Sequence, residues 1–160
     1  MQPRRVLFDT NVYELLLNAQ NLDKIESLVI SGSIIPYGCK TVRDELRDIS
    51  KDEKIGGRSL RTQLLSAYDK LVKDRSYPVG TEIEALARDY LAAYSGGVAK
   101  RKIYPDFKIV AAATIHRLDI IVSEDDRTMK SNPAIRAYQS VNGKKMYITP
   151  NLISLEELKP

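Results

Sequence analysis

The sequence predicts an α/β fold in which a mainly parallel sheet is covered by helices. Short apolar segments typical of buried strands, such as residues 6–8 and 120–122, alternate with longer segments of helical periodicity. Strands that are separated by helices are joined by right-handed crossovers, which make the strands parallel. The 160 residues suffice for one domain with a proper core, so we expect residues 1–160 to form a single domain.

The first half of the chain is predicted to contain two strands and four helices. The expected elements are a strand at residues 4–8, helices at 12–19 and 22–31, a strand at 34–38, a helix from residue 41 to about residue 49 and a helix at 58–73. Gly32 should end the second helix, because glycine is common just after a helix C-terminus. Gly56 and Gly57 interrupt the helical pattern and separate the last two helices.

The second half continues the alternation. Its expected elements are a loop or short edge strand at 76–80, a helix at 81–94, a basic loop at 100–102, a helix at 105–117, a strand at 120–122, a polar turn at 123–127, a short helix at 134–139, a turn at 142–143, a strand at 146–148 and a short helix near residue 155. Thr81, with Glu84 three residues later, has the spacing of a capping box. Pro105 suits the first position of its helix.

Composition limits the class of protein. Cys39 is the only cysteine, which excludes an internal disulfide and fits a reducing cytoplasm. The single histidine, His116, leaves no Cys/His cluster for zinc. No apolar run approaches the length of a membrane span and no secretory signal is evident, so we expect a cytoplasmic protein without a membrane partner. The net charge of +4 suits an anionic partner, although such values are common in proteins without one.

Two acidic residues follow predicted buried strands. Asp9 comes directly after the first strand, and Asp125, with Asp126 beside it, follows the strand at 120–122. Ligands gather beyond the carboxyl ends of parallel strands, so these acids are candidates for a functional site. Each also has a simpler interpretation, because aspartate is a common helix N-cap and a common residue of solvated turns.

Glu45 and Asp106 are two further candidates, on predicted helices. Glu45 lies about 60° from Val42 on a helical wheel, at the border of an apolar seam where a carboxylate needs a partner or a metal. It can instead lean into solvent and pair with a neighbouring arginine. Asp106 precedes a tightly packed apolar run at 109–113 and is expected to point along the buried face of that helix. Its simpler role is a favourable interaction with the helix dipole.

Four segments of the chain resemble the motifs of the PIN-domain ribonucleases. They are Val-Leu-Phe-Asp-Thr-Asn at 6–11, Thr-Val-Arg-Asp-Glu-Leu at 41–46, Pro-Asp at 105–106 with Ile-Val-Ala-Ala-Ala at 109–113, and Ile-Val-Ser-Glu-Asp at 121–125. The resemblance extends over nearly the whole chain and implies a single-domain three-layer α/β/α sandwich. It also implies a divalent-metal-dependent endoribonuclease that cleaves single-stranded or structured RNA. Many members of that family are VapC-type toxins that an antitoxin neutralises.

The resemblance also assigns roles by position. The catalytic and metal-binding acids would be Asp9, Glu45, Asp106 and Asp125, holding Mg²⁺ or Mn²⁺. Supporting residues would be Asn11 and Ser123, with Asp126 beside them. The fourth motif departs from the family pattern because its two aspartates are adjacent, and the offset from Ser123 favours Asp125 as the ligand.

The residue types agree with this chemistry independently of the resemblance. Hard cations such as Mg²⁺ prefer oxygen ligands and keep several waters. The basic residues near Asp106 are candidates for contacts with an RNA backbone, or form a solvated basic loop; they are Lys100, Arg101, Lys102 and Lys108. Two other functions stay open: a phosphoacceptor signalling domain, and a catalytically silent nucleic-acid-binding or scaffold protein of the same fold.

Tyr13 and Leu17 form a second stripe on the first helix, about 100–140° from Val12. We expect this stripe to contact a second copy of the chain, in a homodimer, or an antitoxin helix. The alternative is packing on the next helix of the same chain, at Ile25 and Leu28.

Overall fold

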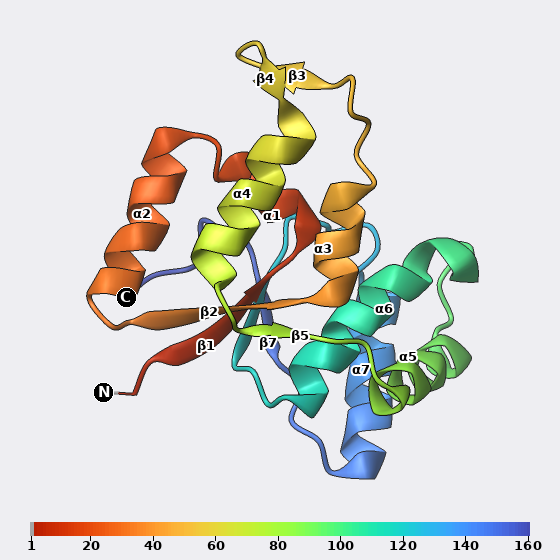
Figure 1. Ribbon diagram of the computed structural model, residues 1–160. Coiled ribbons are helices and arrows are strands. Elements are labelled where there is room, and N and C mark those ends of the chain that lie inside the picture. Colours follow the sequence, from red (N-terminus) through yellow and green to blue (C-terminus); the bar gives the residue numbers. More distant parts are fainter. Residues whose placement is uncertain (1) are drawn as a thin grey trace.

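A five-stranded sheet lies at the centre of the molecule (Figure 1). This computed structural model describes residues 2–160. The strands are β1 (Arg4–Phe8), β2 (Ile34–Cys39), β5 (Ser76–Tyr77), β6 (Ile120–Val122) and β7 (Asn151–Ile153), in the order β5-β2-β1-β6-β7. Each pair of neighbouring strands is parallel, as the alternation of strands and helices predicted.

Helices cover both faces of this sheet. They are α1 (Thr10–Leu15), α2 (Ala19–Ile30), α3 (Lys40–Arg47), α4 (Leu60–Val72), α5 (Thr81–Ala93), α6 (Lys100–Ile115) and α7 (Asn132–Lys145). In Figure 1, α2 and α4 lie on one side of the sheet, and α5, α6 and α7 lie on the other. The predicted three-layer α/β/α class is therefore confirmed. Among residues 2–160, no helix has the length and apolarity to cross a membrane.

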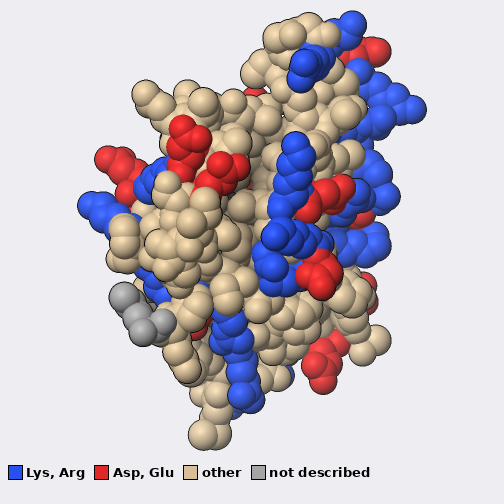
Figure 2. All heavy atoms as spheres, turned by 60° about the vertical axis from the view of Figure 1, so that its left-hand side comes forward, with Lys and Arg blue, Asp and Glu red and all other residues tan. Residues whose placement is uncertain are grey.

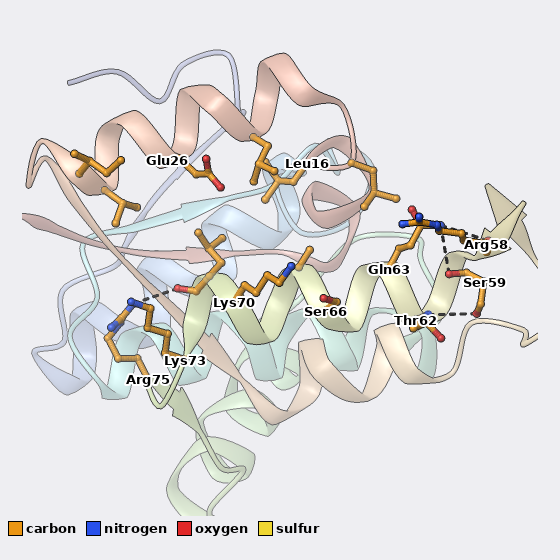
Figure 3. Close-up of a pocket in the computed structure, with 16 residues that line it drawn as sticks. Leu16, Glu26, Arg58, Ser59, Thr62, Gln63, Ser66, Lys70, Lys73 and Arg75 are labelled. Atoms are coloured by element: carbon orange, nitrogen blue, oxygen red, sulfur yellow. Dashed lines mark hydrogen bonds between the residues drawn. The ribbon is translucent and has the colours of Figure 1, made fainter. Parts of the chain in front are cut away.

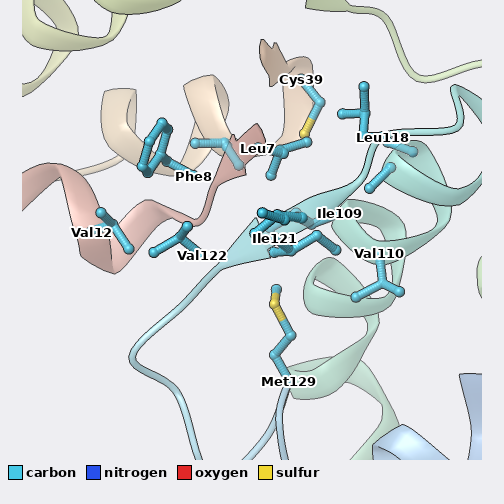
Figure 4. Close-up of a cluster of buried hydrophobic side chains, with 14 of the residues drawn as sticks. Leu7, Phe8, Val12, Cys39, Ile109, Val110, Leu118, Ile121, Val122 and Met129 are labelled. Atoms are coloured by element: carbon cyan, nitrogen blue, oxygen red, sulfur yellow. The ribbon is translucent and has the colours of Figure 1, made fainter. Parts of the chain in front are cut away.

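The two central strands, β1 and β6, are buried and end at the same level. Residues 6–8 are fully buried, and Figure 4 shows Leu7 and Ile121 among apolar side chains of α6. The strands pair in register up to their last residues. The backbone N–H of Asp9 then donates to the carbonyl of Val122 (2.9 Å). The first residues after β1 and β6 are therefore neighbours across the sheet.

The sequence did not predict a small hairpin between α3 and α4. In it, β3 (Lys54–Ile55) pairs antiparallel with β4 (Arg58–Ser59), and Gly56-Gly57 forms the turn with φ values of +59° and +78°. Positive φ at both central positions is the geometry of a tight hairpin turn that glycine adopts easily. The side-chain amide of Gln63 donates to two hairpin carbonyls (3.1 and 3.3 Å), which ties the hairpin to the start of α4.

Helix α6 begins earlier than predicted. It starts at Lys100, so residues 100–102 are helical rather than a loop, and Pro105 lies inside the helix. A proline there removes one backbone hydrogen bond, and three cations in the first turn oppose the helix dipole. Because Ile103 and Phe107 are fully buried, we attribute the early start to the burial of their apolar side chains, which outweighs these local preferences.

The capping box predicted at the start of α5 is wrong. Gly80 is the N-cap residue, and no side chain caps the helix. Thr81 and Glu84 therefore lie one position further into the helix than a capping box requires. Acidic side chains in the first turn, Glu82 and Glu84, interact favourably with the helix dipole instead.

The predicted boundaries near the C-terminus are also wrong. Helix α7 continues through Asn142-Gly143, where a turn was expected, and the last strand is β7 rather than residues 146–148. The segment near residue 155 forms a turn and not a helix.

Asn142 explains the longer helix. Its buried side chain accepts a hydrogen bond from the Tyr90 hydroxyl (2.7 Å) and donates one to Thr149 (3.0 Å). These contacts with distant parts of the chain hold an asparagine in a helix, against its usual preference for turns.

The stripe predicted as a partner surface is divided between the core and a groove. Tyr13 is fully buried and packs against Tyr68 of α4, with ring centroids 5.4 Å apart. A contact of Tyr13 with a second copy or an antitoxin helix is therefore wrong. Leu17 is partly buried and lines a groove between α2 and α4.

Candidate active site

Asp9 lies at the junction of β1 and α1. Its side chain is 4% exposed and accepts hydrogen bonds from the backbone N–H of Thr10 (2.8 Å), the hydroxyl of Ser123 (2.7 Å) and the amide of Asn11 (3.3 Å). Asp9 is the N-cap of α1, as its simpler interpretation proposed. The bond to Ser123 crosses the sheet to the end of β6, and a helix cap alone does not require it.

Glu45 points from α3 toward the same place. Its Oε1 accepts a hydrogen bond from the hydroxyl of Thr10 (2.8 Å). The arginines that could have held it in solvent, Arg43 and Arg47, each pair with a different acid instead (3.1 and 2.6 Å). Glu45 is therefore turned toward Asp9 rather than toward solvent.

Asp125 and Asp106 share one hydroxyl group. Oδ1 of Asp125 accepts from the backbone N–H groups of Arg127 (3.0 Å) and Thr128 (2.9 Å), and its Oδ2 accepts from the Thr128 hydroxyl. The same hydroxyl lies 2.5 Å from Oδ2 of Asp106 on α6. A hydroxyl has one proton, so it can donate to only one of these carboxylates at a time.

Three residues that carry hydroxyl groups link all four acids into one network, which we call the acidic network; Thr10 reaches Glu45 through its hydroxyl and Asp9 through its backbone N–H. The links are Glu45–Thr10–Asp9, Asp9–Ser123–Asp125 and Asp125–Thr128–Asp106. In the second link the Ser123 oxygen accepts from the backbone N–H of Asp125 (3.1 Å). The structure thus brings together four acids that the sequence places far apart, at the carboxyl ends of β1 and β6 and on α3 and α6.

Burial and mutual repulsion disfavour full ionisation of this network. Burial, together with the charges of Asp9, Asp125 and Glu45, raises the pKa of Asp106 to about 7. Burial also raises the pKa values of Asp9 and Glu45, with added contributions from Asp125 and from Asp9 respectively. The acids therefore lie within electrostatic reach of one another, an arrangement that a cation or a proton stabilises.

The three supporting residues occupy different positions. Ser123 is fully buried and contacts Asp9 directly. Asn11 donates to Asp9 and accepts from the backbone N–H of Glu124 (3.2 Å), which joins α1 to the loop after β6. The side chain of Asp126 is 84% exposed and pairs with Lys130 (3.2 Å), so the structure does not bring it to the other acids.

The four basic candidates lie on α6, three of them in its first turn and Lys108 near its middle. Lys108 stands over the ring of Tyr104, with its nitrogen 5.2 Å from the ring centroid, and its charge acts on Glu45. Lys100, Arg101 and Lys102 are exposed in the first turn. Lys108 is therefore near the acidic network, and the other three cations extend the positive charge toward the start of the helix.

The donor atoms of the acidic network fit a hard divalent cation. They are carboxylate and hydroxyl oxygens, the ligand types that Mg²⁺ and Mn²⁺ prefer. Among residues 2–160, no three His, Cys, Asp or Glu side chains form a ready-made ligand set for one ion. Mg²⁺ does not need such a set, because it typically binds one or two carboxylates and keeps several waters.

Sequence reasoning missed two residues of this network, Thr10 and Thr128. Thr10 belongs to the first motif, at residues 6–11, but no role in the site was expected of it. Thr128 lies three residues after Asp125, a spacing that suggests the bond from its own backbone N–H to the Asp125 carboxylate. Nothing in the sequence signals its second contact, because Asp106 is 22 residues away in the chain.

Comparison with solved structures supports the fold. A chain of FitAB bound to the IR36 DNA fragment has a TM-score of 0.61 and 17% identity, with 97% of this chain and 98% of that chain covered. A chain of FitAcB from Neisseria gonorrhoeae has a TM-score of 0.60 and 20% identity, with 96% and 99% covered. No protein-family profile and no curated protein sequence matches the chain. The chain therefore has the PIN fold that its four sequence motifs implied.

Proposed function

We propose that this protein is a divalent-metal-dependent endoribonuclease. The observation that carries the proposal is the acidic network at the carboxyl ends of β1 and β6. Acids that repel one another in a partly buried site are a poor arrangement for stability alone. They are a suitable arrangement for holding a cation that takes part in the hydrolysis of a phosphodiester bond.

The residues of the site would have distinct roles. Asp9, Glu45, Asp106 and Asp125 would hold Mg²⁺ or Mn²⁺. When bound, the cation supplies Lewis-acid chemistry that activates water and stabilises charge on the phosphate. Thr10 and Ser123 orient their carboxylates by hydrogen bonds. The cations of α6 would contact the RNA backbone, with Lys108 nearest to the acids.

A cleavage assay with the purified protein tests this proposal. End-labelled single-stranded RNA and DNA of the same sequence are incubated with Mg²⁺, with Mn²⁺ or with EDTA. We expect RNA cleavage with either metal and none in EDTA, while cleavage in EDTA would refute the metal-dependent mechanism. RNA binding without cleavage would favour a catalytically silent nucleic-acid-binding protein. Cleavage of DNA but not of RNA would show that the substrate is DNA.

We also propose that a protein partner of antitoxin type binds the groove between α2 and α4. The groove has a volume of about 850 Å³ and an apolar lining that includes Leu16, Leu17 and Leu71. Figure 3 shows α2 above and α4 below, with Glu26 and Lys70 facing the space between them. Figure 2 is turned so that the side of the molecule with α2 comes forward, and it shows Lys and Arg side chains beside uncharged surface.

The charge of this groove favours an acidic amphipathic segment of the partner. Its cations outnumber its single acid, Glu26; they are Arg58, Lys70, Lys73 and Arg75. Apolar side chains of the segment would fill the groove, and its acids would meet these cations.

Sedimentation of the protein with the product of a neighbouring small open reading frame tests this partner. We expect a complex that is lost in Lys70→Glu/Lys73→Glu and kept in the control Lys144→Glu/Lys145→Glu, which lies at the end of α7. Self-association without the added product would point to a second copy of this chain instead. Equal binding by both double variants would contradict the proposed groove.

A further inference from the structure

The loop that carries Thr128 is held by several bonds besides those of the Thr128 hydroxyl. The loop after β6 is fixed by other bonds, since the Asp125 carboxylate accepts two backbone N–H groups and the Asp125 carbonyl accepts from Lys130 N–H (2.9 Å). The carbonyl of Thr128 accepts from the Ser131 hydroxyl (2.7 Å), and the next residue, Met129, is buried in the core. Among residues 2–160, the Thr128 hydroxyl forms hydrogen bonds only with the two carboxylates.

Thr10 provides the contrast within the same network. Its hydroxyl donates to one carboxylate, that of Glu45 (2.8 Å), so one proton meets one acceptor. The hydroxyl of Thr128 faces Oδ2 of Asp106 and Oδ2 of Asp125 with a single proton. When both carboxylates are ionised, one of those two oxygens therefore faces a lone pair of the hydroxyl, an arrangement that a nearby cation stabilises.

We propose that Thr128 is a positioning residue that holds the carboxylates of Asp106 and Asp125 in place for the cation. The inference rests on the proposed metal-dependent function. Thr128 does not need to contact the cation. Its hydroxyl donates its proton to one carboxylate and so fixes that group, while the other carboxylate stays free to bind the cation. Residues that orient metal ligands in this way typically change metal affinity by about 10- to 100-fold.

Thr128→Val tests the proposal because valine keeps the branched shape of threonine and lacks the hydroxyl. Thr128→Ser restores a hydroxyl. Thr149→Val is the matched control, since it removes another partly buried threonine hydroxyl, one that accepts from Asn142 after the end of α7. Each protein is titrated with Mn²⁺ by calorimetry, and RNA cleavage is measured as a function of Mn²⁺ concentration.

We expect Thr128→Val to bind Mn²⁺ about 10- to 100-fold more weakly than wild type. Half-maximal cleavage should need correspondingly more Mn²⁺, while KM for RNA stays unchanged. Thr128→Ser and Thr149→Val should resemble wild type. If Thr128→Val fails to fold, Thr128→Ala removes the same hydroxyl and gives the same comparison.

Two results separate this proposal from the function it rests on. Equal Mn²⁺ affinity in wild type and Thr128→Val, with cleavage by both, overturns the role of Thr128 and leaves the nuclease standing. If wild type shows no Mn²⁺ binding and no metal-dependent cleavage, the proposed function is refuted, and the role of Thr128 is refuted with it. Equal weakening in Thr149→Val would show a nonspecific effect and would also overturn the proposal.

Discussion

The two halves of the acidic network are held in different ways. In the first half, three groups donate to Asp9, and Glu45 has the hydroxyl of Thr10 to itself. In the second half, Asp106 shares a single hydroxyl with Asp125 and accepts from no other donor in the described chain. Burial raises the pKa of Asp106 to about 7. The comparison indicates that hydrogen bonds nearly satisfy Asp9 and also hold Asp125, whereas Asp106 needs a cation or a proton.

The largest expected effect is the loss of RNA cleavage when either half of the acidic network is altered. Asp9→Asn and Asp106→Asn should each lower the rate of RNA cleavage in Mn²⁺ by at least about 100-fold, because several kcal/mol of charge stabilisation is lost and each 1.36 kcal/mol is tenfold in rate. Single-turnover cleavage gives the rates, and circular dichroism confirms that each variant is folded. Full activity of Asp106→Asn would remove the second half from the mechanism.

The two halves should respond in opposite directions when stability is measured in EDTA at neutral pH. Asp9→Asn should lower the free energy of unfolding by about 1–3 kcal/mol, because the new amide places donors against the Ser123 and Asn11 donors. Asp106→Asn should raise the melting temperature, because it removes repulsion from the other acids.

Metal should then stabilise wild type more than Asp106→Asn. A ligand that binds only the folded state adds about 2.7 kcal/mol at a hundredfold excess over Kd. Thermal melts of both proteins with and without Mn²⁺ measure the difference. A lower melting temperature for Asp106→Asn in EDTA, without any metal-dependent shift in wild type, would remove Asp106 from the proposed metal site.

The gap between wild type and Asp106→Asn should depend on pH. The folded pKa of Asp106 is about 7, above its ordinary value of 3.8, so the folded protein binds this proton more tightly than the unfolded chain does. The stability that the carboxyl group contributes is full below pH 3.8 and is lost as the pH rises through 7. In EDTA the melting temperature of wild type should therefore fall relative to the variant across this window. A gap that does not change with pH would contradict the raised pKa.

The smallest expected effect concerns Asp126. Asp126→Asn should leave the Mn²⁺ requirement of cleavage unchanged and alter stability by no more than about 1 kcal/mol, because its partner Lys130 forms only a surface ion pair with it. Asp125→Asn should abolish cleavage in the same assay. Loss of cleavage in both variants would mean that the loop after β6 rearranges when the cation binds.

The sequence predicted the positions of the acids because those positions depend on simple features. Asp9 follows a fully apolar strand, and in a parallel sheet the residue after such a strand lies at the functional edge. Glu45 lies at the border of an apolar seam, which the helical period alone determines. Strand and helix periods thus predicted where these acids would point.

The features that the sequence did not predict depend on contacts between residues far apart in the chain. Pro105 inside α6 and Asn142 inside α7 both violate local preferences, and buried neighbours outweigh those preferences. Thr128 meets Asp106 only after α6 and the loop after β6 have packed together. No local pattern records such a contact, so the linking residues of the network could not be predicted even where the acids could.

The exposed turn at Gly56-Gly57 gives this fold a natural point of division. Residues before the turn supply β1, Asp9 and Glu45, and residues after it supply β6, Asp106 and Asp125. The central pairing of β1 with β6 therefore joins the two sides of the turn. Fragments 1–56 and 57–160 would each lack half of the acids, so metal-dependent stabilisation would return only when they reassemble. Fused to two other proteins, such fragments would form a split reporter of whether those proteins meet.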